Sequence, residues 1–300
     1  MAAKVRRLKM GVTLTVAVSL AIVLLAPSPV VPASAYEVGG GDVPLSVNDF
    51  SVVPQSIIDN AAELATELFG KDETKCHDFI SQLLAIYLAA KDKDIVIIVN
   101  SGGWGWTSIE ELPHGHDLVA GLEAELDSLG YSTLWLDHYR TAHSLNGCLS
   151  ELMLAPGLYP SKAKDLALRV EFLTSHIPGI KVILAGISNG CTVCEGVMRI
   201  LKYNQQVYSV QLGPPFWNNC LALDRSLILR SNGVVPDPFS QGNLFIIIRA
   251  NLEALFGISQ ENPGNILLYI GAPGHDYRWR HPEVRSQIID FLDENLSLKQ

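Results

Sequence analysis

The stretch ILAGISNGCTV, residues 183–193, decides the fold because it combines a buried strand, a sharp turn and the start of a helix. Apolar and small residues lead into Gly186-Ile187-Ser188-Asn189-Gly190, and a helix-like pattern follows. Glycines two positions either side of Ser188 remove side chains that would collide in a tight strand-to-helix turn. In this context the turn presents the serine as a nucleophile. The alternative is an ordinary glycine-rich turn in which Ser188 caps the helix.

The alternation of strand and helix extends along the chain on both sides of this turn. Six short apolar runs are typical of buried parallel strands: 94–99, 132–136, 181–185, 207–212, 226–230 and 266–270. Helical patterns separate or follow them near 118–130, 162–177, 189–203, 244–256 and from Pro282 onward. The sequence therefore predicts an α/β fold, a doubly wound and mostly parallel sheet flanked by helices.

The first 35 residues have the pattern of an export signal. Four cations precede an uncharged apolar run over 10–26, and Ala33-Ser34-Ala35 offers small residues for cleavage. The apolar run also approaches the length of a membrane anchor, so a cleaved signal and a retained anchor both stay open. Either way the basic end faces the cytoplasm. We expect a secreted or extracytoplasmic protein, associated with the membrane through residues 10–26 if the anchor is retained.

The rest of the chain divides into three parts. Residues 36–53 are polar and rich in glycine and are expected to form a linker. Residues 54–93 carry two helical patterns and are expected to form a helical N-terminal extension. Residues 94–300 contain all six strand candidates and are expected to form one α/β domain.

Charge and cysteine content exclude several classes of function. Residues 1–35 hold four of the 22 Lys and Arg and no acidic residue, so the remainder has 18 cations against 31 anions, a net charge of −13. Nucleic acid is therefore not an expected partner. Five cysteines permit disulfides in an exported chain, but their odd number leaves a thiol unpaired. The CTVC pair at 191–194 is expected to be buried. No second Cys or His pair stands at zinc-ligand spacing, so no structural metal site and no cofactor are expected.

A histidine beyond Ser188 in the chain is the candidate general base. His275 lies in the loop after the strand candidate 266–270, where it would reach back over the carboxyl edge of the sheet toward Ser188. His77, His176 and His281 fall on helices or helix starts, and the remaining four histidines lie before Ser188 in the chain; of these, His138 and His143 are the reserves. We expect His275 to take the proton of the Ser188 hydroxyl.

The candidate acid is Asp237, which follows the strand candidate 226–230 by a short loop. A carboxylate there would orient the imidazole and stabilise its cation. The alternative is that Pro-Asp-Pro forms only a turn, in which Asp237 bonds its own backbone. Asp224 is the second candidate and Glu253 the third.

The loop NSGGWGW, residues 100–106, is the candidate oxyanion site. Its glycines follow a buried strand, so their backbone N–H groups can point into a cleft. We expect Gly103 or Trp104 to donate to a developing oxyanion together with Asn189, the residue after the nucleophile. The alternative is that the glycines make a tight turn and the tryptophans pack on the rim.

Taken together, these motifs resemble the α/β-hydrolase family over roughly residues 94–297. The glycine loop, Ser188, Asp237 and His275 follow one another in the order of that family's oxyanion loop, nucleophile, acid and base. The resemblance implies an eight-stranded sheet and a Ser-His-Asp triad that hydrolyses ester-like bonds. Three departures stand out: Ile187 precedes the serine where many lipases have His, the oxyanion loop begins Asn-Ser, and the segment 43–93 looks helical where the family usually begins with antiparallel strands.

Two functions of different classes follow. The first is an exported serine hydrolase that cleaves a carboxylic ester or thioester, with a small-molecule or lipid-like ester as substrate. The second is a non-catalytic α/β-hydrolase-like module that binds a ligand or partner in the same cleft. A weaker third hypothesis makes Cys76 the nucleophile of a separate cysteine hydrolase, but the helical segment around it is too short to fold alone with its own base.

Overall fold

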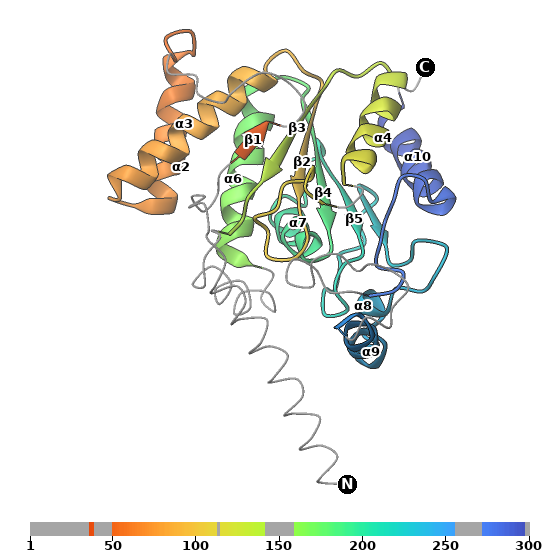
Figure 1. The fold of residues 1–300 in the computed structure, drawn as a ribbon. Helices are drawn as coiled ribbons and strands as arrows, with labels where there is room; N and C mark the ends of the chain where they lie inside the picture. The colour runs from red at the N-terminus through yellow and green to blue at the C-terminus, as the bar shows by residue number, and fades with distance from the viewer. Residues whose placement is uncertain (1–35, 39–49, 113–114, 142–158, 256–271, 298–300) are drawn as a thin grey trace.

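The computed structural model describes residues 36–38, 50–112, 115–141, 159–255 and 272–297, which form one sheet with helices on both faces (Figure 1). Six strands make up the sheet in these residues: β1 Tyr36–Val38, β2 Ile95–Asn100, β3 Thr133–His138, β4 Lys181–Ile187, β5 Val207–Leu212 and β6 Ser226–Leu229. Their order across the sheet is β1-β3-β2-β4-β5-β6. Strands β2 to β6 pair in parallel, and β1 pairs antiparallel with β3 at the edge.

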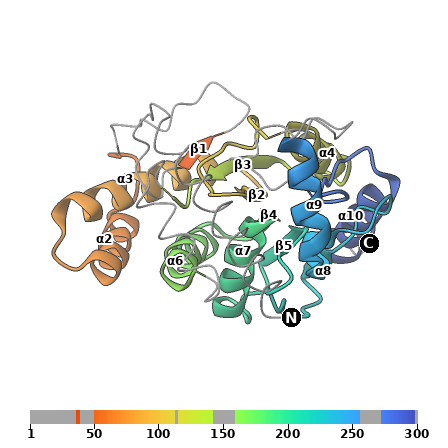
Figure 2. The same cartoon turned by 60° about the horizontal axis from the view of Figure 1, so that its bottom comes forward.

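The helices form layers on the two faces of the sheet. Their bounds are α2 Gln55–Phe69, α3 Glu73–Ala90, α4 Gly115–Ser128, α6 Pro160–His176, α7 Asn189–Ile200, α8 Pro238–Gln241, α9 Leu244–Leu255 and α10 Pro282–Leu296. Helices α6 and α7 cover one face, with α2 and α3 packed in the same apolar cluster, and α4 and α10 cover the other (Figure 2). Helices α8 and α9 lie beyond the ends of the strands (Figure 1).

Both faces of the central strands are buried, which explains why their sequences are apolar without alternation. In β2, Val96 and Ile98 join the cluster under α6 and α7, whereas Ile95 and Ile97 join the cluster under α4 and α10. All six residues of β2 are buried, and so are all six of β5. The polar residues on one face of β5 are buried but hydrogen-bonded: Gln211 donates to Ser209 at 3.3 Å, and Ser209 donates to Ser226 at 3.0 Å.

The path of the chain creates a crevice between β2 and β4. From β2 the chain passes through α4 to β3 on one side, and it later passes from β4 through α7 to β5 on the other. Because crossover connections are right-handed, the two directions place α4 and α7 on opposite faces of the sheet. The loops that leave the carboxyl ends of β2 and β4 therefore diverge, and such a switch point is where open α/β sheets bind ligands.

The fold class predicted from the sequence is confirmed, including the helical N-terminal extension. Five of the six predicted strands are present as β2 to β6. The sixth, 266–270, lies outside the described residues. Strand β1 lies within the segment predicted as a linker, and the short helix α8 lies where only a turn was considered. The described sheet has six strands, compared with the eight that the family resemblance implies.

The predicted export signal and anchor, including residues 10–26 and the Ala33-Ser34-Ala35 site, lie outside the described residues. Among the helices in the described parts of the chain, none is long and apolar enough to cross a bilayer.

We expect Gly190→Ala to destabilise the protein, although alanine normally favours a helix. A Cβ at Gly190, in the first turn of α7, would lie 1.9 Å from the carbonyl oxygen of Asn100, which is backbone and cannot rotate away. Overpacking of this kind costs about 1–3 kcal/mol of unfolding free energy, measurable by urea denaturation. The control is Gly179→Ala, which meets no atom within 4 Å and only strains a positive φ of 78°. A Gly190→Ala protein as stable as wild type would show that this close approach is not required.

Candidate active site

Ser188 sits on a strained turn between β4 and α7. Its backbone has φ 52° and ψ −121°, and within the described residues the only other non-glycine residue with a positive φ is Tyr159. Such a conformation costs on the order of 1–3 kcal/mol and persists only where the surroundings enforce it. The N–H of Ser188 donates to Leu212 at 2.9 Å, and its carbonyl accepts from Cys191 at 3.0 Å. Its side chain makes no capping hydrogen bond, so the capping alternative does not explain the hydroxyl.

Three glycines make room for this turn. A Cβ at Gly186 would lie 2.8 Å from the Cα of Cys191, and one at Gly190 would strike the end of β2. A Cβ at Gly102 would lie 3.2 Å from the Cβ of Ser188 and 3.4 Å from the carbonyl oxygen of Ile187. The loop after β2 therefore lies directly against the serine, at the crevice that the topology creates.

The carboxylate of Asp237 is completely buried and accepts five hydrogen bonds. One oxygen accepts from the backbone N–H groups of Phe239 and Ser240, at 2.9 and 3.2 Å, so Asp237 caps α8. The other accepts from Ser240 Oγ at 2.9 Å, Tyr277 Oη at 2.8 Å and His275 Nδ1 at 2.8 Å. Asp237 thus makes both the local turn and the contact with the histidine that the sequence presented as alternatives.

The environment of Asp237 favours its charged form. Burial alone would raise the pKa of Asp237, but hydrogen bonding and attraction to His275, with hydrogen bonds from Tyr277 and Ser240, outweigh burial and lower the pKa. Burial, followed by the charge of Asp237, raises the pKa of Tyr277 far above its usual value. Tyr277 therefore remains a neutral hydroxyl donor and Asp237 a carboxylate acceptor at neutral pH.

His275 is held on three sides. Its ring lies edge-on to Phe239, with 4.8 Å between ring centroids, and perpendicular to Tyr277 at 6.1 Å. Gly274, with φ 76°, allows the loop to approach the neighbouring chain, since a Cβ there would lie 2.5 Å from the carbonyl oxygen of Val235. The side chain of His275 is 13% exposed, so the ring still reaches the surface of the site.

The end of β5 lies between His275 and Ser188. Strands β4 and β5 pair Ile187 with Leu212, and Ser188 donates its N–H to the Leu212 carbonyl. The next residue, Gly213, lies against the imidazole: a Cβ at Gly213 would lie 2.8 Å from Cε1 of His275. With Nδ1 directed at Asp237, the opposite ring nitrogen is the one that faces away from the acid, as a general base requires.

The predicted oxyanion loop makes a tight turn beside the serine. The N–H of Gly105 donates to Gly102 at 3.2 Å, and Gly103 has φ 56°. The side-chain amide of Asn189 donates to the carbonyl of Gly103 at 3.2 Å, which ties this loop to the residue after Ser188. The backbone N–H of Asn189 is at the first position of α7, where no intrahelical acceptor exists. Trp104 stacks on the buried Trp106, with ring centroids 5.9 Å apart, so the two tryptophans pack against each other beside this loop.

The reserve residues lie elsewhere. His138 ends β3, two strands from β4, and its Nδ1 is 2.6 Å from Oδ1 of Asn100. Burial lowers the pKa of His138 to about 3, so it remains neutral. His143 lies outside the described residues.

The reserve acids are also away from the histidine. Asp224 is exposed and precedes β6, at the amino ends of the parallel strands, whereas Ser188 follows the carboxyl end of β4. Glu253 pairs with Arg249 on the surface of α9.

The structure adds three residues that the sequence did not indicate. Tyr277 and Ser240 donate to Asp237, and the buried Arg140 contacts the glycine loop. Tyr277 lies two residues after His275 and Ser240 three residues after Asp237, and the latter spacing is a recognisable helix-cap signal. No local pattern identifies Arg140.

The cysteines take no part in this arrangement. Cys191 and Cys194 are buried free thiols, as predicted, and burial raises the pKa of each well above its usual value. Cys76 is a partly exposed free thiol on α3, and Cys148 lies outside the described residues. No group of three or more His, Cys, Asp or Glu side chains in the described part of the chain is arranged to hold a metal ion.

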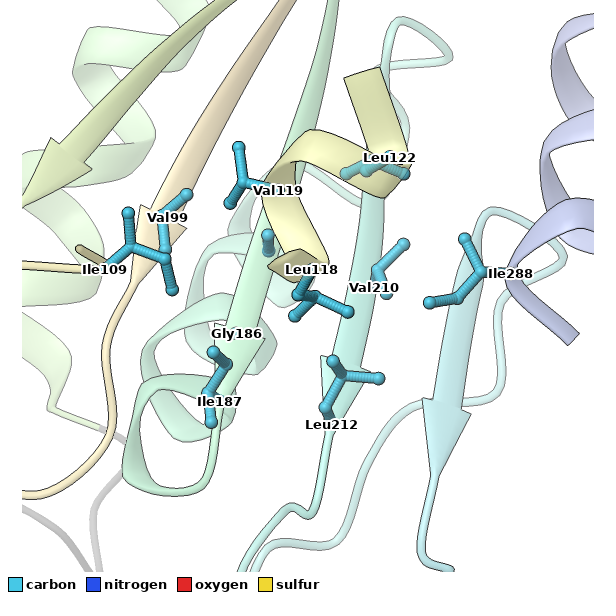
Figure 3. Close-up of a pocket in the computed structure, with 11 residues that line it drawn as sticks. Val99, Ile109, Leu118, Val119, Leu122, Gly186, Ile187, Val210, Leu212 and Ile288 are labelled. Atoms are coloured by element: carbon cyan, nitrogen blue, oxygen red, sulfur yellow. The ribbon is translucent and has the colours of Figure 1, made fainter. Parts of the chain in front are cut away.

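A separate small pocket lies between α4 and the sheet (Figure 3). Apolar residues such as Val99, Leu118 and Val210 line it, and Gly186 and Ile187 border it at the end of β4. Its lining contributes no polar side chain, so this pocket cannot orient a reacting group and belongs to the apolar core.

Comparisons with known proteins identify no family for this chain. No family model matches it, and no curated protein matches its sequence. Among solved structures, it is similar to a Trichoderma reesei cutinase in complex with a C11Y4 phosphonate inhibitor. The two share 13% identity with a TM-score of 0.40, over 81% of this chain and 94% of that chain. Every residue role discussed below therefore depends on the geometry of this chain alone.

Proposed function

We propose that this protein is an exported serine hydrolase that cleaves carboxylic esters or thioesters through Ser188, His275 and Asp237. The contact between His275 Nδ1 and the buried Asp237 carboxylate, beside a serine held at a strained turn, carries the proposal. The end of β5 relates the two, since Ser188 donates its N–H to the Leu212 carbonyl and the next residue, Gly213, packs against the imidazole. A serine within reach of a histidine that is itself oriented by an acid is the arrangement of an activated nucleophile, and this hydrogen bond often tightens only when substrate binds. We further propose that residues 1–35 direct export, as a signal or an anchor, and that the linker 36–53 and extension 54–93 precede the catalytic domain 94–300.

In the proposed reaction, Ser188 Oγ attacks the acyl carbon while His275 takes the hydroxyl proton. The new bond moves the carbonyl electrons onto oxygen, and N–H groups of Gly103 or Trp104 with Asn189 stabilise that charge. Collapse of the intermediate breaks the ester bond, and His275 gives its proton to the departing alcohol or thiol. Water then attacks the acyl-enzyme and loses a proton to His275, which returns that proton to Ser188 Oγ as the bond to the serine breaks and the acid is released.

Asp237 is suited to its role because it needs no proton during this cycle. Its low pKa keeps the carboxylate charged, so it can stabilise the imidazolium that forms in each step. Tyr277 donates to the same oxygen, and the Ser240 hydroxyl, which lies between this oxygen and the Pro214 carbonyl, also contacts it; both contacts fix its position relative to Nδ1. The acid is therefore rigid and charged before substrate arrives.

An apolar surface beside the site favours an apolar ester. Of the eleven exposed large hydrophobic residues in the described chain, three lie elsewhere, at Val52, Ile200 and Tyr203. The other eight lie on or near α8 and α9: Phe216, Trp217, Val234, Val235, Phe245, Ile246, Ile248 and Leu252. Exposed apolar residues gathered in this way mark an interaction site.

This surface is continuous with the catalytic histidine. Phe239 lies against His275, Trp217 lies against Phe239 at 5.5 Å, and Phe216 lies against Trp217 at 4.9 Å, all edge-on. Gly242, between α8 and α9, packs on the ring of Phe216. We therefore propose that an apolar part of the ester lies on this row of aromatic rings while its carbonyl reaches Ser188.

We expect Asp237→Asn to lower kcat by about 10⁴, because the amide holds the imidazole in the wrong tautomer. The control is Asp224→Asn, which changes an exposed carboxylate at the amino ends of the strands, the end away from Ser188. This variant should keep kcat within twofold of wild type. Steady-state hydrolysis of p-nitrophenyl esters measures both, with Ser188→Ala as the baseline. A fully active Asp237→Asn variant would refute the proposed acid, and a wild type that hydrolyses none of the esters would favour the non-catalytic binding module.

We expect Trp217→Ala to lower kcat/KM about tenfold for p-nitrophenyl dodecanoate and less than twofold for the acetate, because only the longer chain reaches the aromatic row. The control is Tyr203→Ala, since Tyr203 is 82% exposed beyond the carboxyl end of α7. Equal losses on both esters would contradict a role for Trp217 in substrate binding. So would a loss in Tyr203→Ala as large as that in Trp217→Ala.

A further inference from the structure

Arg140 joins the loop after β3 to the loop after β2. Its side chain is only 1% exposed and lies two residues beyond β3. The guanidinium donates from Nη1 to the carbonyl oxygen of Ser101 and from Nη2 to that of Gly103, the latter at 2.7 Å. The backbone N–H of Arg140 donates to the carbonyl of Gly105 at 3.0 Å. One residue thus holds three alternate carbonyls of the proposed oxyanion loop.

The loop is shaped around this side chain. A Cβ at Gly105, which has φ 78°, would lie 2.4 Å from both Cγ and Cζ of Arg140. The guanidinium also lies over the ring of Tyr159, with 5.8 Å from Cζ to the centroid. A planar fork with several fixed donors matches two carbonyls of one tight loop, whereas a lysine ammonium has a single nitrogen and a flexible stem.

These contacts determine where the loop's N–H groups point. In a trans peptide unit the C=O and the following N–H point in opposite directions, and the described residues contain no cis peptide bond. Since the carbonyls of Ser101 and Gly103 face the guanidinium, the N–H groups of Gly102 and Trp104 face away from it. Asn189 Nδ2 donates to the same Gly103 carbonyl, so the residue after the nucleophile shares this restraint.

We propose that Arg140 is a positioning residue that fixes the peptide planes of 101–105 and so preorganises the oxyanion site. This inference rests on the proposed hydrolase function. Donors that are already oriented stabilise the developing charge without reorganisation in the transition state. Arg140 does not touch the substrate, because its guanidinium is buried beneath the loop, and it acts through the orientation of the N–H groups of Gly102 and Trp104, of which Trp104 is a proposed oxyanion donor.

The test compares Arg140→Lys with Arg225→Lys. Arg225 is also buried, at 8% exposure, and also donates from both Nη atoms to backbone carbonyls, those of Val207 and Lys202. It lies just before β6, at the amino ends of the parallel strands, whereas Ser188 lies at their carboxyl ends. Both substitutions remove a buried guanidinium and keep a positive charge, so they are matched in their general effect on stability.

Three quantities are measured for each variant: kcat and KM for p-nitrophenyl acetate, the inhibition constant of an alkyl trifluoromethyl ketone, and the melting temperature. The ketone adds to the serine and forms a tetrahedral oxyanion, so its affinity reports the oxyanion site directly. We expect Arg140→Lys to lower kcat about tenfold to a hundredfold, to leave KM nearly unchanged and to weaken the ketone by a similar factor. Arg225→Lys should lower only the melting temperature.

Two results would overturn the proposal: an Arg140→Lys enzyme with wild-type kcat and ketone affinity, or equal catalytic losses in Arg225→Lys. If Arg140→Lys does not fold, Gly105→Ala is the second variant, because its Cβ displaces the loop from the intact arginine. It should lower kcat and weaken ketone binding together. A folded Gly105→Ala enzyme with wild-type kcat and ketone affinity would refute the inference. A wild type that neither hydrolyses the ester nor binds the ketone would instead refute the proposed function.

Discussion

The arrangement depends on how closely the first turn of α7 approaches the end of β2. Gly190 touches the carbonyl of Asn100, Gly102 touches Ser188, and Gly186 touches the start of the helix. Any side chain at these positions would push the two loops apart. With the glycines in place, the strained serine and the predicted oxyanion loop meet at the point where the sheet reverses its winding. The geometry of the site is thus a consequence of backbone packing in the centre of the sheet.

A second constraint is the buried carboxylate of Asp237. An isolated carboxylate would be unstable there, but five donor groups from two segments, 239–240 and 275–277, stabilise it. Two of those donors belong to the loop that carries His275, so the charge of Asp237 also holds that loop in place. Nearby, Asn232 donates to Asp276 at 2.9 Å and connects the same two loops again. Burial of the acid therefore gives the histidine its orientation.

Features that depend on local sequence were predictable. Continuous apolar runs identified β2 and β4, because a strand buried on both faces favours them. The glycine spacing indicated the strained turn at Ser188, and the positions of Asp237 and His275 after strand candidates indicated the pair that is hydrogen-bonded in the structure. The assignment of their catalytic roles remains a prediction.

Features that depend on distant contacts were not predictable. Strand β1 has only three residues, and its strand character comes from pairing with β3. Arg140 would ordinarily be placed on the surface, since nothing near it in the sequence shows that the carbonyls of Ser101 and Gly103 will surround it. From the sequence, Tyr277 would be predicted to be an ordinary core aromatic residue. Only the structure places its hydroxyl 2.8 Å from the Asp237 carboxylate. Side-chain partners that lie far apart in the sequence can be identified only from the folded structure.

The most direct test of the central claim is covalent labelling of the wild-type protein with a fluorophosphonate, followed by mass spectrometry of its peptides. The account predicts one adduct per chain, on Ser188, and a much slower reaction in His275→Gln, because the serine then lacks its base. Unlabelled Ser188 in folded wild-type protein, or an adduct on a different residue, would contradict it.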